Sequence, residues 1–269
     1  MRDDPSRRMN LPRFAANLTM MFTEWEFLDR FAAAAESGFD AVEFLFPYEY
    51  DPEQIAKRLQ DHHLTQALFN CPPGDWAKGE RGLASLVGRE DEFRQSIDKA
   101  LIYADATGVK RLHVMSGLSD HHDPAALKTY RAALIYACEK AQKKSIDILI
   151  EPINGRDMPG YFLNDFNFAA ALIADLALPN LKLQYDIYHR QILHGDVIKS
   201  LEALMSMIGH IQIAAVPLRH EPMSGELDDA RVLHSLDQLG YQGFVGLEYR
   251  PAKGTREGLV WRDNFMKAV

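Results

Sequence analysis

Four residues with oxygen-bearing side chains recur near the ends of four successive strand-like runs in the second half of the chain. In each run the apolar side chains alternate with the other residues. Because alternate residues of a strand face opposite sides, the apolar set of each run is expected to pack outward and the oxygen-bearing residue to face the interior. These residues are Glu151, Asp186, Gln212 and Glu248.

Such a ring of side chains points to metal chemistry. Three of the four residues are carboxylates, which repel one another and resist ionisation in a shared cavity unless a cation joins them. Mg²⁺ and Mn²⁺ are hard divalent cations that prefer oxygen ligands. The pattern therefore predicts a Mg²⁺ or Mn²⁺ site formed by Glu151, Asp186, Gln212 and Glu248. The alternative, that each acid caps a helix or pairs with an arginine, would explain any one of them alone.

Three more polar residues are candidates for substrate binding at the same end of the strands. The same alternation places Glu43 of AVEFL and His113 of RLHVM on the interior side, although His113 could also be a core histidine with its hydrogen bonds satisfied. His189 follows Asp186 by three residues in DIYH and is expected just above the strand end. Beside a metal site it could donate a hydrogen bond to a substrate.

Two arginines are candidates for holding a substrate carboxylate in a bidentate ion pair. Arg219 follows the seventh strand-like run in PLRHEP, where a plain surface arginine is the alternative. Arg81 lies in the segment 71–90, which is long and rich in Gly, Pro and charged residues. Such a segment is typical of a lid or a substrate clamp, or else of a surface excursion.

Eight strand-like runs alternate with helix-like segments from Arg13 onward. Such alternation predicts parallel strands joined by right-handed crossovers. Eight units in about 255 residues match a (β/α)8 barrel, whose active sites lie at the carboxyl ends of the strands. A doubly wound open sheet is disfavoured, because NLTMMFTEW follows the first run in place of a glycine-rich phosphate loop. The strand-like runs are 13–18, 41–45, 64–70, 111–117, 147–153, 181–187, 210–216 and 243–250. The helix-like segments cover roughly 23–38, 89–107, 124–144, 164–176, 194–207 and 227–239.

Composition narrows the possible partners and the compartment. The formal net charge of −8 over 269 residues argues against nucleic acid as a partner, because phosphate binding usually needs a basic face. Cys71 and Cys138 lie far apart, as is typical of free thiols in a reducing compartment. No apolar run is long enough to span a membrane, and nothing at the N-terminus is typical of a signal peptide. We expect a cytoplasmic protein without a nucleic-acid or membrane partner.

The organisation that we expect is a single domain. Residues 1–11 are polar and charged and are expected to form a disordered extension, in which Met9 is an alternative start to Met1. Residues 12–269 contain no linker or low-complexity tract and are expected to form one catalytic barrel. The sequence is compatible with a monomer and with a homo-oligomer.

Several motifs are spread over nearly the whole chain from Arg13. They are FAANLTMMFTE (14–24), AVEFLFPY (41–48), GDWAKGERG (74–82), IEPIN (150–154), QYDIYH (184–189), HIQIA (210–214), RHEP (219–222) and GLEYRP (246–251). Together they resemble the hydroxypyruvate isomerase family, which includes the 2-oxo-tetronate isomerases and belongs to the xylose-isomerase-like barrel superfamily.

The resemblance implies a (β/α)8 barrel and two catalytic glutamates that donate and accept a proton. By motif these are Glu151 of IEPIN and Glu248 of GLEYRP. The substrate would be a small carboxylate-bearing sugar acid. The reaction would convert hydroxypyruvate to tartronate semialdehyde, or a 2-oxo-tetronate to a 3-oxo-tetronate, through an enediolate. Related epimerases bind a divalent metal through Glu, Asp, His and Glu, and Gln212 departs from this set because those enzymes carry histidine in an HxH segment.

Other functions remain possible at this point. A ketose 3-epimerase shares the barrel and the two glutamates, but HIQIA in place of HxH weighs against it. A DNA-repair endonuclease of the same superfamily needs a richer histidine cluster for zinc and a basic groove, and neither feature is evident in this sequence. A non-catalytic binding barrel would be expected to lack one of the two glutamates, but this chain has both.

Overall fold

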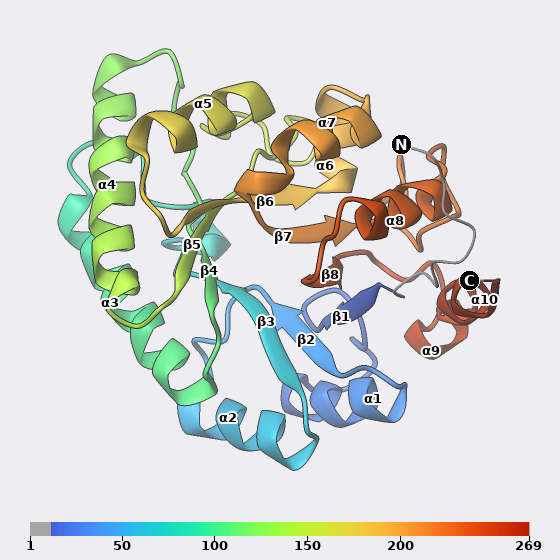
Figure 1. Cartoon of the computed structure of the whole chain (residues 1–269). Helices are drawn as coiled ribbons and strands as arrows, with labels where there is room; N and C mark the ends of the chain where they lie inside the picture. The colour runs from blue at the N-terminus through green and yellow to red at the C-terminus, as the bar shows by residue number, and fades with distance from the viewer. Residues whose placement is uncertain (1–11, 269) are drawn as a thin grey trace.

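Eight parallel strands close into a barrel in the computed structural model, which describes residues 12–268. Each strand pairs with the next, and β8 pairs with β1 to complete the ring (Figure 1). The strands are β1 (Arg13–Asn17), β2 (Ala41–Phe44), β3 (Thr65–Asn70), β4 (Arg111–His113), β5 (Asp147–Ile150), β6 (Leu181–Asp186), β7 (Ile208–Ile213) and β8 (Phe244–Leu247). The predicted (β/α)8 barrel is confirmed. The extension predicted at residues 1–11 lies outside the described residues.

Helices lie between successive strands and cover the outside of the barrel (Figure 1). Their apolar faces and the outward faces of the strands form one continuous core. The α-helices are α1 (Arg30–Glu36), α2 (Pro52–Asp61), α3 (Glu90–Thr107), α4 (Pro124–Gln142), α5 (Phe166–Leu176), α6 (Ile187–Leu193), α7 (Val197–Leu204), α8 (Asp229–Gln238), α9 (Thr255–Gly258) and α10 (Val260–Ala268). Three 3-10 turns accompany them, η1 (Phe27–Asp29), η2 (Trp76–Lys78) and η3 (Met205–Met207).

Two helical regions differ from the sequence-based expectation. The helix predicted over roughly 194–207 is present as α7 and η3, but the sequence patterns did not predict α6. This helix begins directly after β6, where the Asp186 side chain caps it by accepting a hydrogen bond from Tyr188 N (2.8 Å). The sequence patterns also did not predict α2. Its start carries a clear signal, a capping box in which Asp51 and Gln54 each bond the other's backbone N–H.

The barrel contains a small apolar cluster that is separate from the main core. It is formed by Ala15, Ala41, Ala67 and Phe244, which lie on β1, β2, β3 and β8. Further along the same strands the inward residues are polar and buried. This change from small apolar to polar side chains places the polar residues toward the carboxyl ends of the strands, where barrel enzymes have their active sites.

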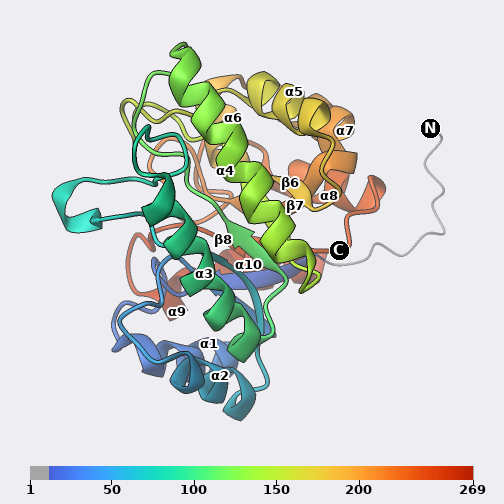
Figure 2. The same ribbon diagram turned by 90° about the vertical axis from the view of Figure 1, so that its left-hand side faces the viewer.

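The segment between β3 and α3 extends away from the body of the barrel (Figure 2). It contains η2 and the two residues Trp76 and Arg81, which stack on one another with the guanidinium carbon 3.9 Å from the ring centre. Both cysteines, Cys71 and Cys138, are free and buried, as expected. None of the described helices is both long and apolar enough to cross a membrane.

Candidate active site

Polar side chains from seven strands meet at the carboxyl end of the barrel. Glu151 directly follows β5, Asp186 ends β6 and Glu248 directly follows β8, and each is at most 7% exposed. These three carboxylates therefore share one buried region, as the side-chain alternation predicted. The other buried polar residues around them are Asn17, Glu43, His113, His189, His210 and Gln212.

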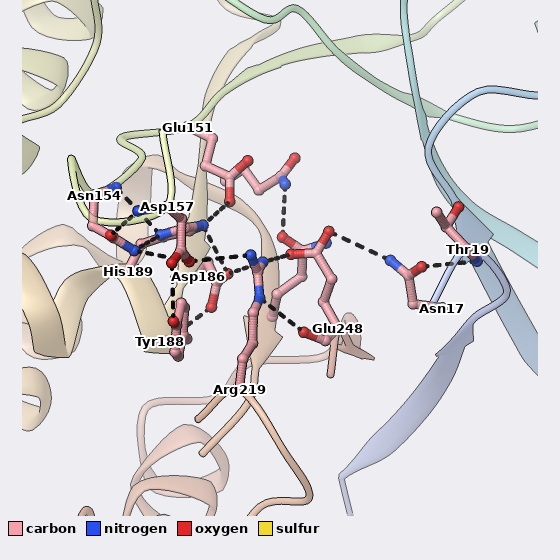
Figure 3. A network of polar contacts seen from close by, with 12 residues as sticks. Asn17, Thr19, Glu151, Asn154, Asp157, Asp186, Tyr188, His189, Arg219 and Glu248 are labelled. Atoms are coloured by element: carbon pink, nitrogen blue, oxygen red, sulfur yellow. Dashed lines mark hydrogen bonds and ion pairs between the residues drawn. The ribbon is translucent and has the colours of Figure 1, made fainter. Parts of the chain in front are cut away.

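Arg219 lies among these carboxylates and supplies their positive charge (Figure 3). Its Nη2 donates to Glu248 Oε2 at 2.5 Å and to Asp186 Oδ2 at 3.4 Å. Its Nη1 lies 3.5 Å from Asp157 Oδ2, and its guanidinium carbon stacks over the Tyr188 ring at 4.8 Å. A guanidinium that is only 12% exposed and held in this way offsets much of the repulsion among the acids.

The loop after β7 is shaped to hold Arg219 in this place. Arg219 has a left-handed backbone conformation, with φ of 56°, which is uncommon for a residue with a side chain. Its N–H donates to Ala215 O (2.8 Å), and its carbonyl accepts from Arg250 N (2.8 Å). The backbone thus joins the Arg219 loop to the segment after β8 that carries Glu248.

Glu151 has a different environment from Glu248. Its Oε2 lies 3.6 Å from His113 Nδ1 and its Oε1 lies 3.9 Å from His189 Nε2, but Oε1 has no hydrogen-bond partner among the described residues. Burial raises the pKa of Glu151 well above its ordinary value, and the negative charges of Glu248 and Asp186 raise it further. Glu151 is consequently the carboxyl group that most readily carries a proton.

Burial also raises the pKa of Glu248 and of Asp186, but the charge of Arg219 acts in the opposite direction on both. The direct ion pair favours the ionised form of Glu248 over that of Glu151. The two glutamates thus share a cavity in unequal surroundings: the pKa of Glu248 is raised to about 8, and that of Glu151 is raised well above its ordinary value.

A second polar layer lies below the first, around Glu43. Its Oε1 accepts from Asn17 Nδ2 (3.0 Å) and from Gln212 Nε2 (2.8 Å), and its Oε2 lies 2.6 Å from His210 Nε2. Asn17 Nδ2 is also 3.5 Å from Glu248 Oε1 and so connects the two layers. Gly246 makes room for this arrangement, because a Cβ there would lie 2.2 Å from a Glu43 carboxylate oxygen.

Gln212 has both ends of its amide engaged. Its Oε1 accepts from Gln184 Nε2 (2.7 Å) while its Nε2 donates to Glu43. The structure therefore brings it beside the carboxylates but in contact with the lower layer. Glu151, Asp186 and His189 each offer one possible ligand atom for a metal ion, and these atoms lie within 4.8 Å of one another.

The structure does not bring Arg81 to this cluster through any contact that it describes. The Arg81 guanidinium donates to the carbonyls of Trp76 (3.1 Å) and Glu80 (2.7 Å) in its own loop. Its role in substrate binding stays a prediction.

His189 is held by the segment that follows β5. The backbone N of Asn154 lies 3.3 Å from His189 Nδ1, and Asn154 Nδ2 lies 2.6 Å from the same atom (Figure 3). Sequence reasoning assigned no role to Asn17, Asn154, Asp157 or Tyr188. For Asn154 a signal was present, since it belongs to the motif IEPIN.

Comparison with known proteins gives a consistent family relationship. A family model described as the xylose isomerase-like TIM barrel matches residues 31–265. The 2-oxo-tetronate isomerase of Cupriavidus necator is 53% identical to the chain, and the matched region covers 93% of the chain and 97% of that relative. The hydroxypyruvate isomerase of Escherichia coli is 42% identical, with 94% of the chain and 99% of the relative covered.

Solved structures give the same architecture. A Brucella melitensis protein described as AP endonuclease, family 2 superposes with a TM-score of 0.93 at 47% identity, over 94% of the chain and 99% of that protein. The 3-keto-D-glucoside 4-epimerase of Escherichia coli superposes with a TM-score of 0.76 at 21% identity, over 95% and 100% of the two chains. The second likeness concerns the fold alone.

Proposed function

The chain belongs to the xylose isomerase-like TIM barrel family, as its motifs predicted, and we propose that it interconverts a small 2-oxo sugar acid and its aldehyde or 3-oxo isomer. The relatives named 2-oxo-tetronate isomerase and hydroxypyruvate isomerase support an isomerase of small sugar acids. The proposed substrates are hydroxypyruvate and the four-carbon 2-oxo-tetronates.

The observation that carries the proposal is the unequal pair of buried glutamates in one cavity. Glu248, whose ionised form the ion pair with Arg219 favours, would remove the proton from C3, the hydroxyl-bearing carbon next to the C2 carbonyl. Glu151, whose pKa burial raises, would deliver a proton to C2. The electron pair of the broken C–H bond forms an enediolate between the two carbons. Transfer of the hydroxyl proton from O3 to O2, together with protonation at C2, then leaves a hydroxyl group at C2 and the carbonyl at C3.

The oxygen atoms of the enediolate need a donor in the same cavity. His189 Nε2 lies 3.5 Å from Asp186 Oδ2 and faces the region between Asp186 and Glu151. We assign His189 the role of hydrogen-bond donor to a substrate oxygen. His113, which contacts Glu151 from the other side, would help to orient that carboxyl group.

The carboxylates fit a divalent cation. Glu151 Oε1 is a buried carboxylate oxygen without a partner among the described residues, and Asp186 offers another oxygen within 4.8 Å. Mg²⁺ or Mn²⁺ would be held by Glu151 and Asp186, with Glu248 and the second lone pair of the Gln212 carbonyl oxygen completing the predicted set. When bound, it would polarise the substrate carbonyl as a Lewis acid.

Arg219 is the proposed partner of the substrate carboxylate as well as of Glu248. A guanidinium has five N–H donors. Two polar contacts join it to Glu248, one joins it to Asp186 and one joins it to Asp157. The remaining N–H groups would donate hydrogen bonds to the substrate carboxylate. The N–H group now in contact with Asp157 would do the same once the substrate displaces Asp157.

A coupled isomerase assay tests the proposal. The purified protein is incubated with hydroxypyruvate and with 2-oxo-tetronates, with and without a chelator, and the isomeric product is trapped by a specific dehydrogenase. We expect turnover of at least one of these substrates and a lower rate with the chelator. Absence of turnover on all of them, in protein that has been reloaded with Mg²⁺ or Mn²⁺, would overturn the proposed activity.

A further inference from the structure

Asn154 is completely buried, and its amide orientation is fixed by its own loop. Its Oδ1 accepts hydrogen bonds from the backbone N–H groups of Arg156 and Asp157, both at 3.0 Å. A backbone N–H can only donate, so the oxygen must face these two groups. The NH₂ group of Asn154 consequently points the other way, toward His189 (Figure 3).

Two donors converge on one nitrogen of the His189 ring. Asn154 Nδ2 lies 2.6 Å and the Asn154 backbone N lies 3.3 Å from His189 Nδ1. Since both groups donate, Nδ1 must be the ring nitrogen without a proton. The single ring proton is therefore on Nε2, the nitrogen that faces Asp186 and Glu151.

We propose that Asn154 is a positioning residue that holds His189 in the Nε2–H form, so that His189 donates a hydrogen bond to the substrate and does not ligate a metal. A metal ligand needs a lone pair, which Nε2–H lacks, and the lone pair on Nδ1 is already used by Asn154. The metal site next to His189 is then an all-oxygen site. The part of this inference that concerns the substrate rests on the proposed isomerase function, whereas the ring form does not.

The ring form can be measured without substrate or metal. In the full-length protein labelled with ¹⁵N-histidine, long-range proton–nitrogen spectra report which nitrogen of each ring carries the proton. His189→Gln identifies the His189 signals by their loss. We expect the Nε2–H pattern for His189 at neutral pH. An Nδ1–H pattern, or a doubly protonated ring, in the wild-type protein would overturn the proposal.

Asn154→Asp separates positioning from a purely structural role. An aspartate keeps the acceptor for the N–H groups of Arg156 and Asp157, but it replaces the donor facing His189 Nδ1 with an acceptor. We expect the ring proton to move to Nδ1 and kcat to fall by about 10²–10⁴-fold, with a much smaller change in KM. Asn167→Asp adds the same charge at an exposed position on α5 and should change neither quantity.

If Asn154→Asp retains the Nε2–H pattern while kcat falls, Asn154 does not act through the ring form and the proposal fails. The wild-type spectrum decides the ring form even if the variant does not fold. A wild-type protein that turns over none of the 2-oxo acids would overturn the proposed function, while the spectrum would still decide the form of His189.

Discussion

Arg219 Nη2 lies 2.5 Å from Glu248 Oε2, so one of the two proposed catalytic carboxylates carries its own buried counter-ion. No described contact joins Glu151 to a cation in the same way; its nearest basic neighbours are the buried histidines His113 and His189. This difference gives two chemically identical side chains the opposite tendencies that proton transfer between adjacent carbons requires.

Removal of Arg219 should change the pH dependence of the reaction. Arg219 lowers the pKa of Glu248 against the effect of burial, so Arg219→Ala should raise that pKa. Because the base is active when ionised, the low-pH limb of kcat/KM should move to higher pH, and the plateau should fall by about 10²-fold or more. A pH profile of kcat/KM measures both effects.

Arg94→Ala is the matched control for this variant. Arg94 pairs with Asp91 on the exposed face of α3, and its removal should leave the profile unchanged. A low-pH limb that stays in place in Arg219→Ala would show that Arg219 does not set the ionisation of the base.

Gly246→Ala should destabilise the barrel. The added Cβ would lie 2.2 Å from a Glu43 carboxylate oxygen, so Glu43 would have to leave its contacts with Asn17, His210 and Gln212. We expect a loss of about 1–3 kcal/mol in the free energy of unfolding, measured by urea denaturation.

Gly155→Ala provides the comparison, because a Cβ at that position meets no heavy atom within 4 Å and the backbone is not left-handed. Its free energy of unfolding should stay within about 0.5 kcal/mol of the wild-type value. Equal stability of the two variants would contradict the packing described for Glu43.

The buried histidine His113 should make the protein less stable in acid. Burial lowers its pKa from 6.5 to about 3, so between these values the unfolded chain binds a proton that the folded protein does not. This contribution to stability is fully present above pH 6.5 and is lost as the pH falls toward 3. It gives the free energy of unfolding a slope of up to about 1.4 kcal/mol per pH unit in that range.

His113→Phe removes this titration while keeping an aromatic ring in the core. The free energy of unfolding of both proteins is followed from pH 7 downward. As the pH falls, the wild type should lose stability relative to the variant. A constant difference over the acid range would contradict the assignment of His113 as a buried neutral histidine.

Metal binding should depend on Glu151. Calorimetric titration with Mn²⁺ should show a loss of affinity of about 10-fold or more in Glu151→Gln, since this carboxylate supplies the unpartnered oxygen. Glu202→Gln, which changes an exposed acid on α7 paired with Lys199, should bind Mn²⁺ like the wild type. Equal affinities in all three proteins would remove Glu151 from the metal site.

Much of the site could be predicted because strand alternation is a local property. The positions of Glu151, Asp186 and Glu248 follow from which residues of β5, β6 and β8 must pack against the helices. The partners of these residues could not be predicted in the same way. His210 belongs to the motif HIQIA, yet its contact with Glu43 joins residues 167 positions apart and depends on the absence of a side chain at Gly246.

Arg219 shows a second reason for the limit of sequence reasoning. Its residue type indicated anion binding, but its place among the carboxylates depends on a left-handed backbone and on hydrogen bonds to Ala215 and Arg250. The electrostatic argument required a cation near the acids and favoured a metal ion over an arginine. It could not show that the chain itself supplies one, since nothing in the sequence around Arg219 fixes the course of that loop.

Deuterium exchange tests the central claim most directly. Substrate is incubated in D₂O with wild-type protein, Glu151→Gln or Glu248→Gln, and the C3 proton and the product are followed by NMR. With Glu248 as base and Glu151 as acid, Glu151→Gln should still exchange the C3 proton while isomerising at least about 10²-fold more slowly, and Glu248→Gln should do neither. Isomerisation at the wild-type rate in either variant, or exchange retained in Glu248→Gln and lost in Glu151→Gln, would contradict these roles.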